Sequence, residues 1–394
     1  MPYRILFLFW CLLVILLREY RLLVEPRFWA EEGTIFYAFA FNNSVFDLFS
    51  KPHIGYYALY NNLSALLSVT LVPVEYAPFV TTYLGIFIVL LPVLIILFTN
   101  SLFWDTTAKK IIISLFIIFL SPHELWLNST NAHFYLGLSA LLVLTADETR
   151  EKWKKMASWS VLILAGLSGP ETCFFIPALA LNLWRKPSGE NIIRFSILAI
   201  CALVQSGILI WSALYHNQYG RYQNFDFNRY FLFYIRDSFG LLLPIGQNDR
   251  KNVGFAVALF SLYLFYRNLR YKNVQYLIIS FFIFGFCSTF GSISMRGGDR
   301  YSYITTIILL MILTRESLEY FSFRKFIPGA SLFILIISFT LAILFYQQRV
   351  GSQLSEDNPV WKTEVAKWKK DKTYTLKVPP HNKPDRWEVV LSGN

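Results

Sequence analysis

Charged residues are scarce in this chain of 394 residues: Asp, Glu, Lys and Arg together make up 15% of it, whereas soluble proteins carry about 25%. Hydrophobic residues reach 55% and aromatic residues 18%. The apolar runs are too long and too frequent for a set of soluble domains. The composition therefore predicts an integral membrane protein, in which aromatic rings gather at the two membrane surfaces.

Cysteine is also scarce, and its spacing matches no metal or redox motif, so the cysteines are interpreted as packing residues. They are Cys11, Cys173, Cys201 and Cys287, all in apolar runs. No repeat of fixed period and no low-complexity segment occurs in the sequence, which disfavours transporters built from inverted repeats. No small-residue cleavage site follows the apolar residues 5–17, so we expect a retained first helix rather than a signal peptide.

About eleven apolar runs can form spanning helices, although several are short and need a thinner bilayer or a cavity at one end. The runs are 5–24, 77–98, 110–121, 134–146, 157–169, 172–185, 192–213, 253–269, 274–293, 301–319 and 326–346. Two pairs of short runs predict hairpins with outward apices at 121–133 and 169–171. Helix ends inside the membrane thickness must be covered by protein or by a water-filled cavity. We therefore expect an all-α polytopic bundle with an outward-facing cavity roofed by the first loop.

Basic residues predict the orientation of this bundle. The net charge is +11, and many of the 36 Lys and Arg residues lie at the N-terminus or in short connectors between apolar runs. This is the positive-inside pattern of membrane proteins rather than a nucleic-acid-binding surface. The connectors are 109–110, 150–155, 185–194, 267–272 and 315–325. Placing all of them in the cytoplasm also puts the N-terminus there.

Residues 54–73 are apolar too, but a span there would invert every later connector. Their tyrosines and asparagines suit a helix that lies flat in the outer interface; a true span with a misassigned neighbour is the alternative. The predicted transmembrane domain is 1–346, with a first outer loop at 25–76 and a large outer loop at 214–252. Residues 347–394 form an extracytoplasmic tail that is too small for a core of its own.

Two adjacent carboxylates, Glu31 and Glu32, follow the first helix. Ionisable groups near the membrane plane are functional candidates, and a carboxylate beside apolar rings can act as a general base. The alternative is a helix N-terminus, where the dipole favours acids. Lys51 and His53 close the same loop, where they would bind an anionic substrate or simply neutralise the acids.

The first hairpin apex is polar, and its Asn128, Asn131 and His133 suggest recognition of hydroxyl groups, with Glu124 as a further substrate-binding candidate. A metal site is less favoured there, because the spacing of histidine and glutamate matches no metal motif. No cofactor is assigned, and a divalent cation stays open. Glu171 follows a Gly-Pro break at the second apex, where a structural turn and a site in the same cavity are equally compatible with the sequence.

Several arginines lie in outer segments, against the positive-inside trend. They are Arg229, Arg236, Arg296 and Arg300, the last of which is followed by Tyr301. Guanidinium groups match the geometry of phosphate, so these residues predict a site for a lipid phosphate. The alternative is contact with bulk anionic lipid.

The order of these features resembles the GT-C superfamily of membrane glycosyltransferases. Residues 29–33 (Trp-Ala-Glu-Glu-Gly) resemble a Trp-x-Glu-Asp-Gly element of bacterial members. Residues 51–57 (Lys-Pro-His-Ile-Gly-Tyr-Tyr) resemble the entry to the interfacial helix of lipid A aminoarabinose transferases, and 298–301 (Gly-Asp-Arg-Tyr) an arginine–tyrosine element at a late outer turn. The likeness covers most of residues 1–320 as topology, and its motifs are short.

The resemblance implies an enzyme of the bacterial cytoplasmic (inner) membrane. It would transfer a hexosyl or pentosyl group, with inversion, from a polyprenyl-phosphate sugar to a glycan or lipid acceptor on the extracytoplasmic face. One glutamate of the first loop would be the general base. Glu32 stands where the relatives have Asp, so motif position favours Glu32, with Glu31 next. A transporter or flippase for lipid-linked glycans and an O-antigen polymerase or ligase are the alternatives.

Overall fold

The computed structural model of the chain describes residues 2–185, 187–215, 226–240, 242–243, 247–291, 298–319, 326–346, 358–380 and 387–392. Within these ranges the chain is almost entirely helical, and long helices joined by short connectors form the bundle. They are α1 (Pro2–Arg18), α6 (Ala77–Phe98), α7 (Thr107–Phe119), α8 (Ala132–Thr145), α9 (Lys152–Gly166), α10 (Ile176–Arg185), α11 (Gly189–Tyr215), α12 (Phe227–Gly240), α13 (Gln247–Asn268), α14 (Lys272–Gly291), α15 (Asp299–Glu319) and α16 (Phe326–Leu344).

Shorter elements fill the first loop, the hairpin apices and the tail. The first loop holds α2 (Arg21–Val24), the π-helix η1 (Glu32–Tyr37), α3 (Ala38–Asn42), α4 (Val45–Ser50), α5 (Leu59–Thr70) and the 3-10 turn η2 (Val74–Tyr76). The apices hold the 3-10 turns η3 (His123–Leu125) and η4 (Pro170–Phe175). The tail holds α17 (Trp361–Lys370) and the antiparallel strands β1 (Leu376–Lys377) and β2 (Glu388–Val389).

Most apolar runs of the sequence coincide with one helix, within a few residues at either end, but the run 5–24 is divided between α1 and α2, and the run 172–185 between η4 and α10. In the described ranges, four helices are long and apolar enough to cross a membrane, and the bent pair of α9 with the segment Pro170–Arg185 adds a fifth candidate, with a 114° bend. The four are Val74–Phe98, Gly189–Leu214, Lys272–Gly291 and Ile327–Leu344. This supports a multi-pass membrane protein, while the count of about eleven spans stays a prediction.

Helices α11 and α16 lie at the periphery of the bundle. Only 22% of the apolar window of α11 and 28% of that of α16 is buried. Large apolar side chains project from them, such as Leu203 with 74% exposure and Phe333 with 63%. Extended apolar surface of this kind is typical of helices that face lipid.

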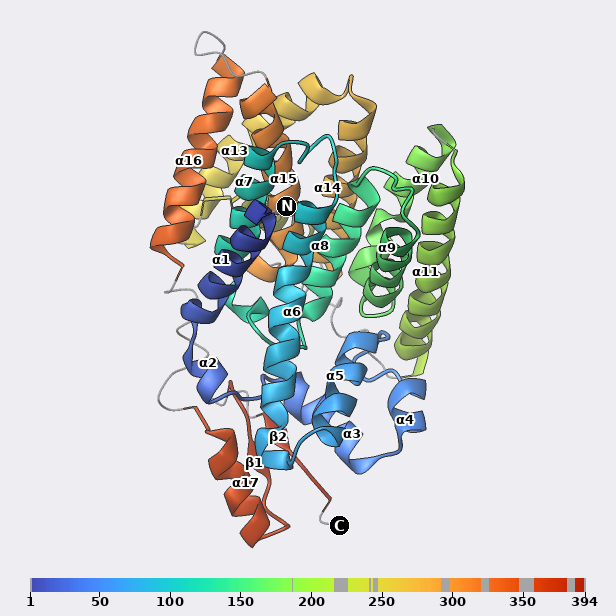
Figure 1. Cartoon of the computed structure of the whole chain (residues 1–394), viewed down its shortest axis with the longest axis vertical. Helices are drawn as coiled ribbons and strands as arrows, with labels where there is room; N and C mark the ends of the chain where they lie inside the picture. The colour runs from blue at the N-terminus through green and yellow to red at the C-terminus, as the bar shows by residue number, and fades with distance from the viewer. Residues whose placement is uncertain are drawn as a thin grey trace.

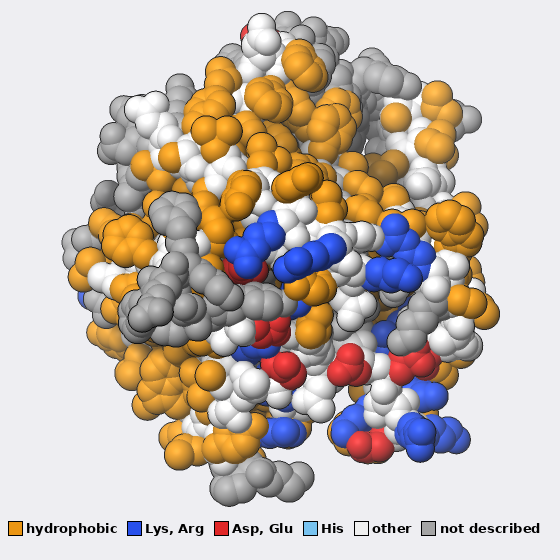
Figure 2. Space-filling view, turned by 90° about the horizontal axis from the view of Figure 1, so that it is seen from above, with side chains coloured by type: hydrophobic (Ala, Val, Ile, Leu, Met, Phe, Trp, Pro, Cys, Tyr) orange, Lys and Arg blue, Asp and Glu red, His pale blue; other side chains and the backbone are white. Residues whose placement is uncertain are grey.

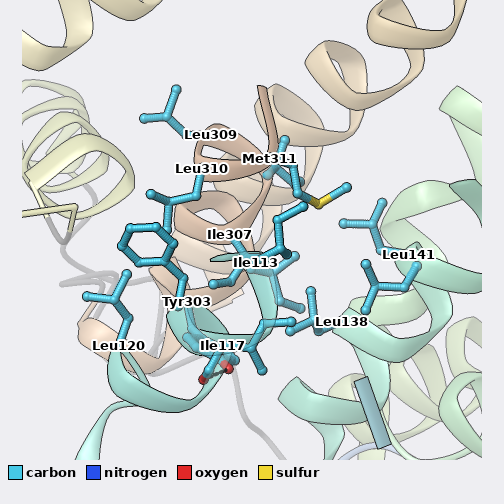
Figure 3. Packing of buried hydrophobic residues seen from close by; sticks show 14 of the residues in the cluster. Ile113, Ile117, Leu120, Leu138, Leu141, Tyr303, Ile307, Leu309, Leu310 and Met311 are labelled. Carbon is cyan, nitrogen blue, oxygen red and sulfur yellow. Dashed lines mark hydrogen bonds between the residues drawn. The ribbon is translucent and has the colours of Figure 1, made fainter. Parts of the chain in front are cut away.

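Helix α15 forms the centre of the bundle. Every residue from Ser302 to Ser317 is buried, and α7, α8, α12, α14 and α16 surround it. Figure 3 shows Ile307 and Met311 of α15 among apolar side chains that include Ile113 of α7 and Leu138 of α8. A helix that is buried on all sides has a fixed position, so the residues of its first turn are held on a rigid element.

The bundle has two chemically different ends (Figure 1). We call the end with α3, α4, α5 and α17 the loop end; the C-terminus lies there as well. The opposite end, where α10 turns into α11 and α13 into α14, is called the connector end. Figure 2 shows this end with Lys, Arg, Asp and Glu side chains grouped among apolar ones. The basic connectors and the acidic loop are therefore separated by the length of the bundle.

Two segments differ from a simple loop. The region 214–252, expected as a large outer loop, contains α12, which packs on α13, α14 and α15. The segment 54–73 contains the 12-residue helix α5, which is about 18 Å long at 1.5 Å per residue and so too short for a bilayer core of about 30 Å. This length favours the interfacial placement, which stays a proposal.

Candidate functional site

The candidate site lies at the loop end, where the first loop meets the apex of the α7–α8 hairpin. Ala30 has a left-handed backbone, with φ of 46°, and its N–H donates to the carbonyl of Pro379 at 2.7 Å. Such a conformation is uncommon for a residue with a side chain, and strained backbone of this kind clusters at functional sites. This turn places Glu31 and Glu32 at the start of η1.

Glu32 is buried, with an exposed fraction of 2%, and it contacts hydrogen-bond donors. Its Oε1 accepts from the N–H and the Oγ of Ser129, both at 2.8 Å, and its Oε2 accepts from the N–H of Trp29 at 3.0 Å. Burial raises the pKa of Glu32, and the hydrogen bonds from Ser129 and Trp29 oppose that shift. Glu32 thus joins the first loop to the hairpin apex, and both of its carboxylate oxygens accept hydrogen bonds.

Glu31 is in a different environment. It is half-buried, and among the described residues no hydrogen bond or ion pair engages its carboxylate. Burial and the charges of Glu171 and Glu31 raise the pKa of Tyr56 well above its ordinary value. Glu31 also interacts electrostatically with His133 and Arg300. Its carboxylate therefore lies within electrostatic reach of both hairpin apices and of the start of α15.

His133 and Glu171 bring the two apices together. Oε1 of Glu171 lies 3.3 Å from Nε2 of His133, and Nδ1 of His133 lies 3.1 Å from the carbonyl of Thr130. Because a carbonyl only accepts, Nδ1 carries a proton, and the contact with Glu171 then needs one more proton on Nε2 or on the carboxyl. Oε2 of Glu171 is buried without a hydrogen-bond partner in the described residues. The ring of Tyr56 packs edge-on against His133, with 5.9 Å between centroids.

Asn128 and Asn131 stabilise the first apex from inside. Nδ2 of each donates to the carbonyl of Glu124, at 2.9 and 2.8 Å, and the N–H of Asn131 donates to Oδ1 of Asn128 at 3.0 Å. Both side chains are buried. Their described contacts therefore set the shape of the apex, and hydroxyl recognition by these amides stays a prediction.

Arg300, in the first turn of α15, reaches the same apex. Its Nη1 lies 3.4 Å from Oε2 of Glu124, and its Nη2 donates to the hydroxyl of Tyr301 at 3.1 Å. The ring of Tyr301 in turn packs on Phe134, with 5.5 Å between centroids. The Arg300 side chain remains 23% exposed and that of Glu124 41% exposed, so this ion pair is accessible to a ligand.

The other predicted phosphate ligands are placed differently. Arg236 binds Asp237 through two hydrogen bonds of 2.5 and 2.7 Å, and Asp237 accepts the N–H of Gly298 at 2.9 Å. These contacts join α12 to the start of α15. The side chain of Arg229 and the whole of Arg296 lie outside the described residues.

Lys51 and His53 make their described contacts within the first loop. Lys51 pairs with Asp47 at 2.9 Å. Nε2 of His53 lies 3.2 Å from the carbonyl of Leu48, and its ring packs against Phe39, with 4.4 Å between centroids. Burial lowers the pKa of His53, so the imidazole is neutral at pH 7. These contacts do not group either residue with Glu31.

The tail packs on the first loop from the side away from the bundle. Trp361 is buried, with its ring 4.9 Å from that of Phe28 and 5.9 Å from that of Tyr37. A Cβ added to Gly33 would lie 3.2 Å from the side chain of Val389 in β2. Together with the Pro379 bond to Ala30, these contacts fix the turn that precedes Glu31.

Two residues at the loop end escaped the sequence analysis. Ser129 supplies two donors to Glu32, its N–H and its Oγ. Arg18 is buried, stacks between the rings of Trp126 and Tyr346 at 4.1 and 4.2 Å, and donates to the carbonyl of Ser121 at 3.0 Å. The available signal for Arg18 was its position: it is a basic residue within the apolar run 5–24, in the half predicted to face outward, against the positive-inside trend.

Neither a metal site nor the outward cavity is established. Within the described ranges, no group of three or more His, Cys, Asp or Glu side chains has a geometry suited to a metal ion. A cavity of about 650 Å³ occurs at the connector end instead, between α6, α8, α9 and α11. The outward-facing cavity therefore stays a prediction from the sequence, and the binding of a divalent cation stays open.

Comparison with known proteins gives little further guidance. No protein-family model matches the chain, and no curated protein matches it. Among solved structures it is similar to the archaeal oligosaccharyltransferase AglB from Archaeoglobus fulgidus, in complex with an inhibitory peptide and a dolichol-phosphate. The TM-score is 0.45 at 11% identity, over 98% of this chain and 61% of AglB, so the chain spans less than two thirds of AglB's length. A TM-score below 0.5 does not establish a common fold, and the function proposed below depends on the site geometry.

Proposed function

We propose that the chain is a membrane glycosyltransferase that moves a sugar from a polyprenyl-phosphate donor to a glycan or lipid acceptor. The reaction takes place at the loop end, on the extracytoplasmic side of a bacterial inner membrane. One observation carries the proposal: Glu31, the His133–Glu171 pair and the Arg300–Glu124 pair come from four separate segments and meet at one end of the bundle.

Such a transfer needs a base for the acceptor hydroxyl and a cation for the leaving phosphate. The acceptor O–H gives its proton to a carboxylate while its oxygen bonds to C1 of the sugar. The bond between C1 and the phosphate oxygen breaks, and the electron pair stays on the phosphate. Arg300 stabilises this negative charge. A single base without a nucleophilic carboxylate gives inversion at C1.

Geometry favours Glu31 over Glu32 as the base, in contrast to motif position. A general base must come within hydrogen-bond distance of the proton that it removes. Both oxygens of Glu32 already accept hydrogen bonds from Ser129 and Trp29. Glu31 is half-buried and has free oxygens among the described contacts. We assign Glu32 the role of holding the loop and Glu31 that of the base.

A transfer assay with purified protein, radiolabelled polyprenyl-phosphate sugars and a membrane-lipid acceptor fraction tests the proposal. Replacing Glu31→Gln should lower the rate by about 10²- to 10⁴-fold, the usual contribution of a general base. Glu25→Gln is the matched control, because Glu25 is an exposed acid of the same loop. Full activity of the Glu31→Gln protein would refute the assignment, and release of an unchanged labelled donor across a vesicle membrane would point to a flippase.

The same assay examines Arg300. Replacing Arg300→Gln removes the cation proposed to hold the donor phosphate while keeping a hydrogen-bond donor. We expect a higher KM for the lipid donor, with the KM for the acceptor unchanged. Lys370, an exposed cation of α17, provides the control substitution Lys370→Gln. An unchanged donor KM in the Arg300 variant would contradict phosphate binding there.

A further inference from the structure

The cavity of about 650 Å³ at the connector end belongs to neither the candidate site nor the tail. Its walls come from α6, α8, α9 and α11 and from the connector between α8 and α9. Ligand sites in proteins measure about 300–1,000 Å³. No residue proposed for the transfer reaction lines this cavity, so any ligand there serves a separate purpose.

The lining divides into an apolar part and a charged part. Helices α6, α8 and α9 provide the apolar part, with Leu91, Leu94, Ile95, Phe98, Val143 and Val161. The connector and the first turn of α9 provide the charged part, with Asp147, Glu148, Arg150, Glu151 and Lys154, and Arg194 of α11 adds a further cation. A ligand that matches both parts has an apolar chain and a charged head.

The boundary between the apolar part and the charged part of the lining lies where a membrane surface is expected. Helix α6 is a candidate span, and Phe98 is its last residue. The charged part begins beyond that point, at Thr99 and Asn100. Trp153 at the rim is 62% exposed, and tryptophan is enriched at the level of lipid headgroups. We propose that this cavity binds one phospholipid from the leaflet at the connector end.

The charges at the rim select the headgroup. Lys154 is paired with Glu151, and Arg194 is paired with Glu190 at 3.1 Å. Arg150 and Asp147 are exposed, and neither has an ion pair within the described part of the chain. A phosphate would give Arg150 a partner, and an ammonium group would give Asp147 one. The rim therefore fits a zwitterionic phosphoethanolamine head, whereas a purely anionic head would leave Asp147 without a cation.

Native mass spectrometry of the full-length protein, purified in detergent, tests this site. Phosphatidylethanolamine and phosphatidylglycerol with identical acyl chains are added separately at equal concentration. We expect one retained phosphatidylethanolamine with higher occupancy than phosphatidylglycerol. Replacing Arg150→Glu should lower that occupancy about fivefold, the effect of one basic residue near a lipid head. The exposed Lys152 does not line the cavity, so Lys152→Glu makes the same charge change as a control.

A second variant addresses the apolar part. Replacing Val161→Phe fills space beside α6 and should reduce the binding of both lipids, while thermal unfolding confirms that the variant is folded. Equal retention of the two lipids by the wild-type protein, or equal loss in the Lys152 and Arg150 variants, would show nonspecific surface lipid and overturn the proposal. A preference for phosphatidylglycerol would overturn the headgroup assignment. The readout does not involve sugar transfer, so it is independent of the proposed enzyme activity.

Discussion

At the residue scale, two neighbouring carboxylates are held in different environments by their backbone. Consecutive residues of a helix point in different directions, and the left-handed Ala30 sets where η1 begins. As a result, Glu32 points to the donors of Ser129, and Glu31 remains free of described bonds. The division of roles that we propose therefore depends on one turn of the backbone and not on the chemistry of the two side chains, which is identical.

His53 gives a pH-dependent prediction at the same scale. Burial lowers its pKa from the ordinary value of 6.5, and the nearby Lys51 adds to this effect. The unfolded chain therefore binds a proton more readily than the folded one. Stability is fully present above about pH 6.5 and falls as the pH drops toward the lower pKa of the folded protein.

Thermal unfolding in detergent at pH 8 and pH 5.5 measures this effect. The wild-type protein should lose stability at the lower pH, and the His53→Gln protein should lose less, because glutamine does not titrate. The comparison at pH 8, where the imidazole is neutral in both states, serves as the control for general damage by the substitution. An equal loss for both proteins would show that His53 is not responsible.

Only some of the residues of the candidate site could be predicted from the sequence. The acids, the apex histidine and Arg300 could be selected because polar residues at outer turns of a membrane protein are conspicuous. Ser129 could not be selected, because it acts on a carboxylate 97 residues away and serine is ordinary in a loop. Lys51 was selected for its charge, but its partner Asp47 lies one helical turn away in α4.

At the element scale, the apex of the α7–α8 hairpin depends on its contact with α6. A Cβ added to Gly85 would lie 2.8 Å from the backbone carbon of Leu127, so only glycine allows this approach. Gly85→Ala should lower the free energy of unfolding by about 1–3 kcal/mol, as for other overpacked sites. Because the apex carries Ser129, it should also lower transfer activity.

Gly207→Ala provides the matched control for that substitution. Gly207 lies inside α11, and nothing comes within 4 Å of its added Cβ. The control should therefore gain about 0.5–1 kcal/mol from helix propensity. Thermal or denaturant unfolding of both variants gives the comparison. Equal behaviour of the two alanine variants would contradict the close approach of the apex to α6.

The tail is a second element whose role can be examined. Trp361 fills the space between Phe28 and Tyr37, and its Nε1 donates to the carbonyl of Val74 at 2.8 Å. Trp361→Ala should lower the free energy of unfolding by about 3–5 kcal/mol through lost packing. The substitution should also release the tail from the first loop. We expect faster cleavage of the tail by trypsin and a lower kcat for transfer, with the donor KM unchanged.

Trp184→Ala is the control for that change, because Trp184 in α10 is 82% exposed. It should alter neither the cleavage rate nor kcat. Were the Trp361→Ala protein to keep both its protease resistance and its kcat, the tail would have no part in holding the turn before Glu31. A loss of kcat without faster cleavage would also contradict release of the tail as the cause.

Elements that bury one long apolar run were predictable, and others were not. The run 77–98 coincides with α6, because continuous apolar sequence has no stable alternative to a helix in lipid. Helix α12 was hidden, since its apolar stretch, residues 230–235, is too short for a span and is flanked by Arg229 on one side and by Arg236 and Asp237 on the other. The π-helical turn of η1 was also not predictable, because it depends on contacts with the apex and the tail.

At the scale of the whole molecule, the two ends have separate tasks in our proposals. The loop end gathers the acidic loop, both hairpin apices and the start of α15, and the connector end gathers the basic connectors and the lipid-sized cavity. The central helix α15 joins the ends: Arg300 lies in its first turn, and Arg315 near its other end pairs with Glu319 at 3.0 Å. A sugar transfer at one surface is thus separated from lipid binding at the other.

This arrangement makes a direct prediction about membrane topology. Lys370 of α17 and Lys152, the first residue of α9, are both exposed and lie at opposite ends of the bundle. A membrane-impermeant maleimide should label a Lys370→Cys protein in intact cells and a Lys152→Cys protein only after the membrane is opened.

The wild-type chain gives the background, which should be low because Cys11 and Cys201 are buried and Cys173 and Cys287 are half-buried. Labelling of both variants in intact cells would contradict the two-ended arrangement. The reverse pattern would put the acidic loop in the cytoplasm, where an extracytoplasmic transferase cannot have its base, and would contradict the proposed function.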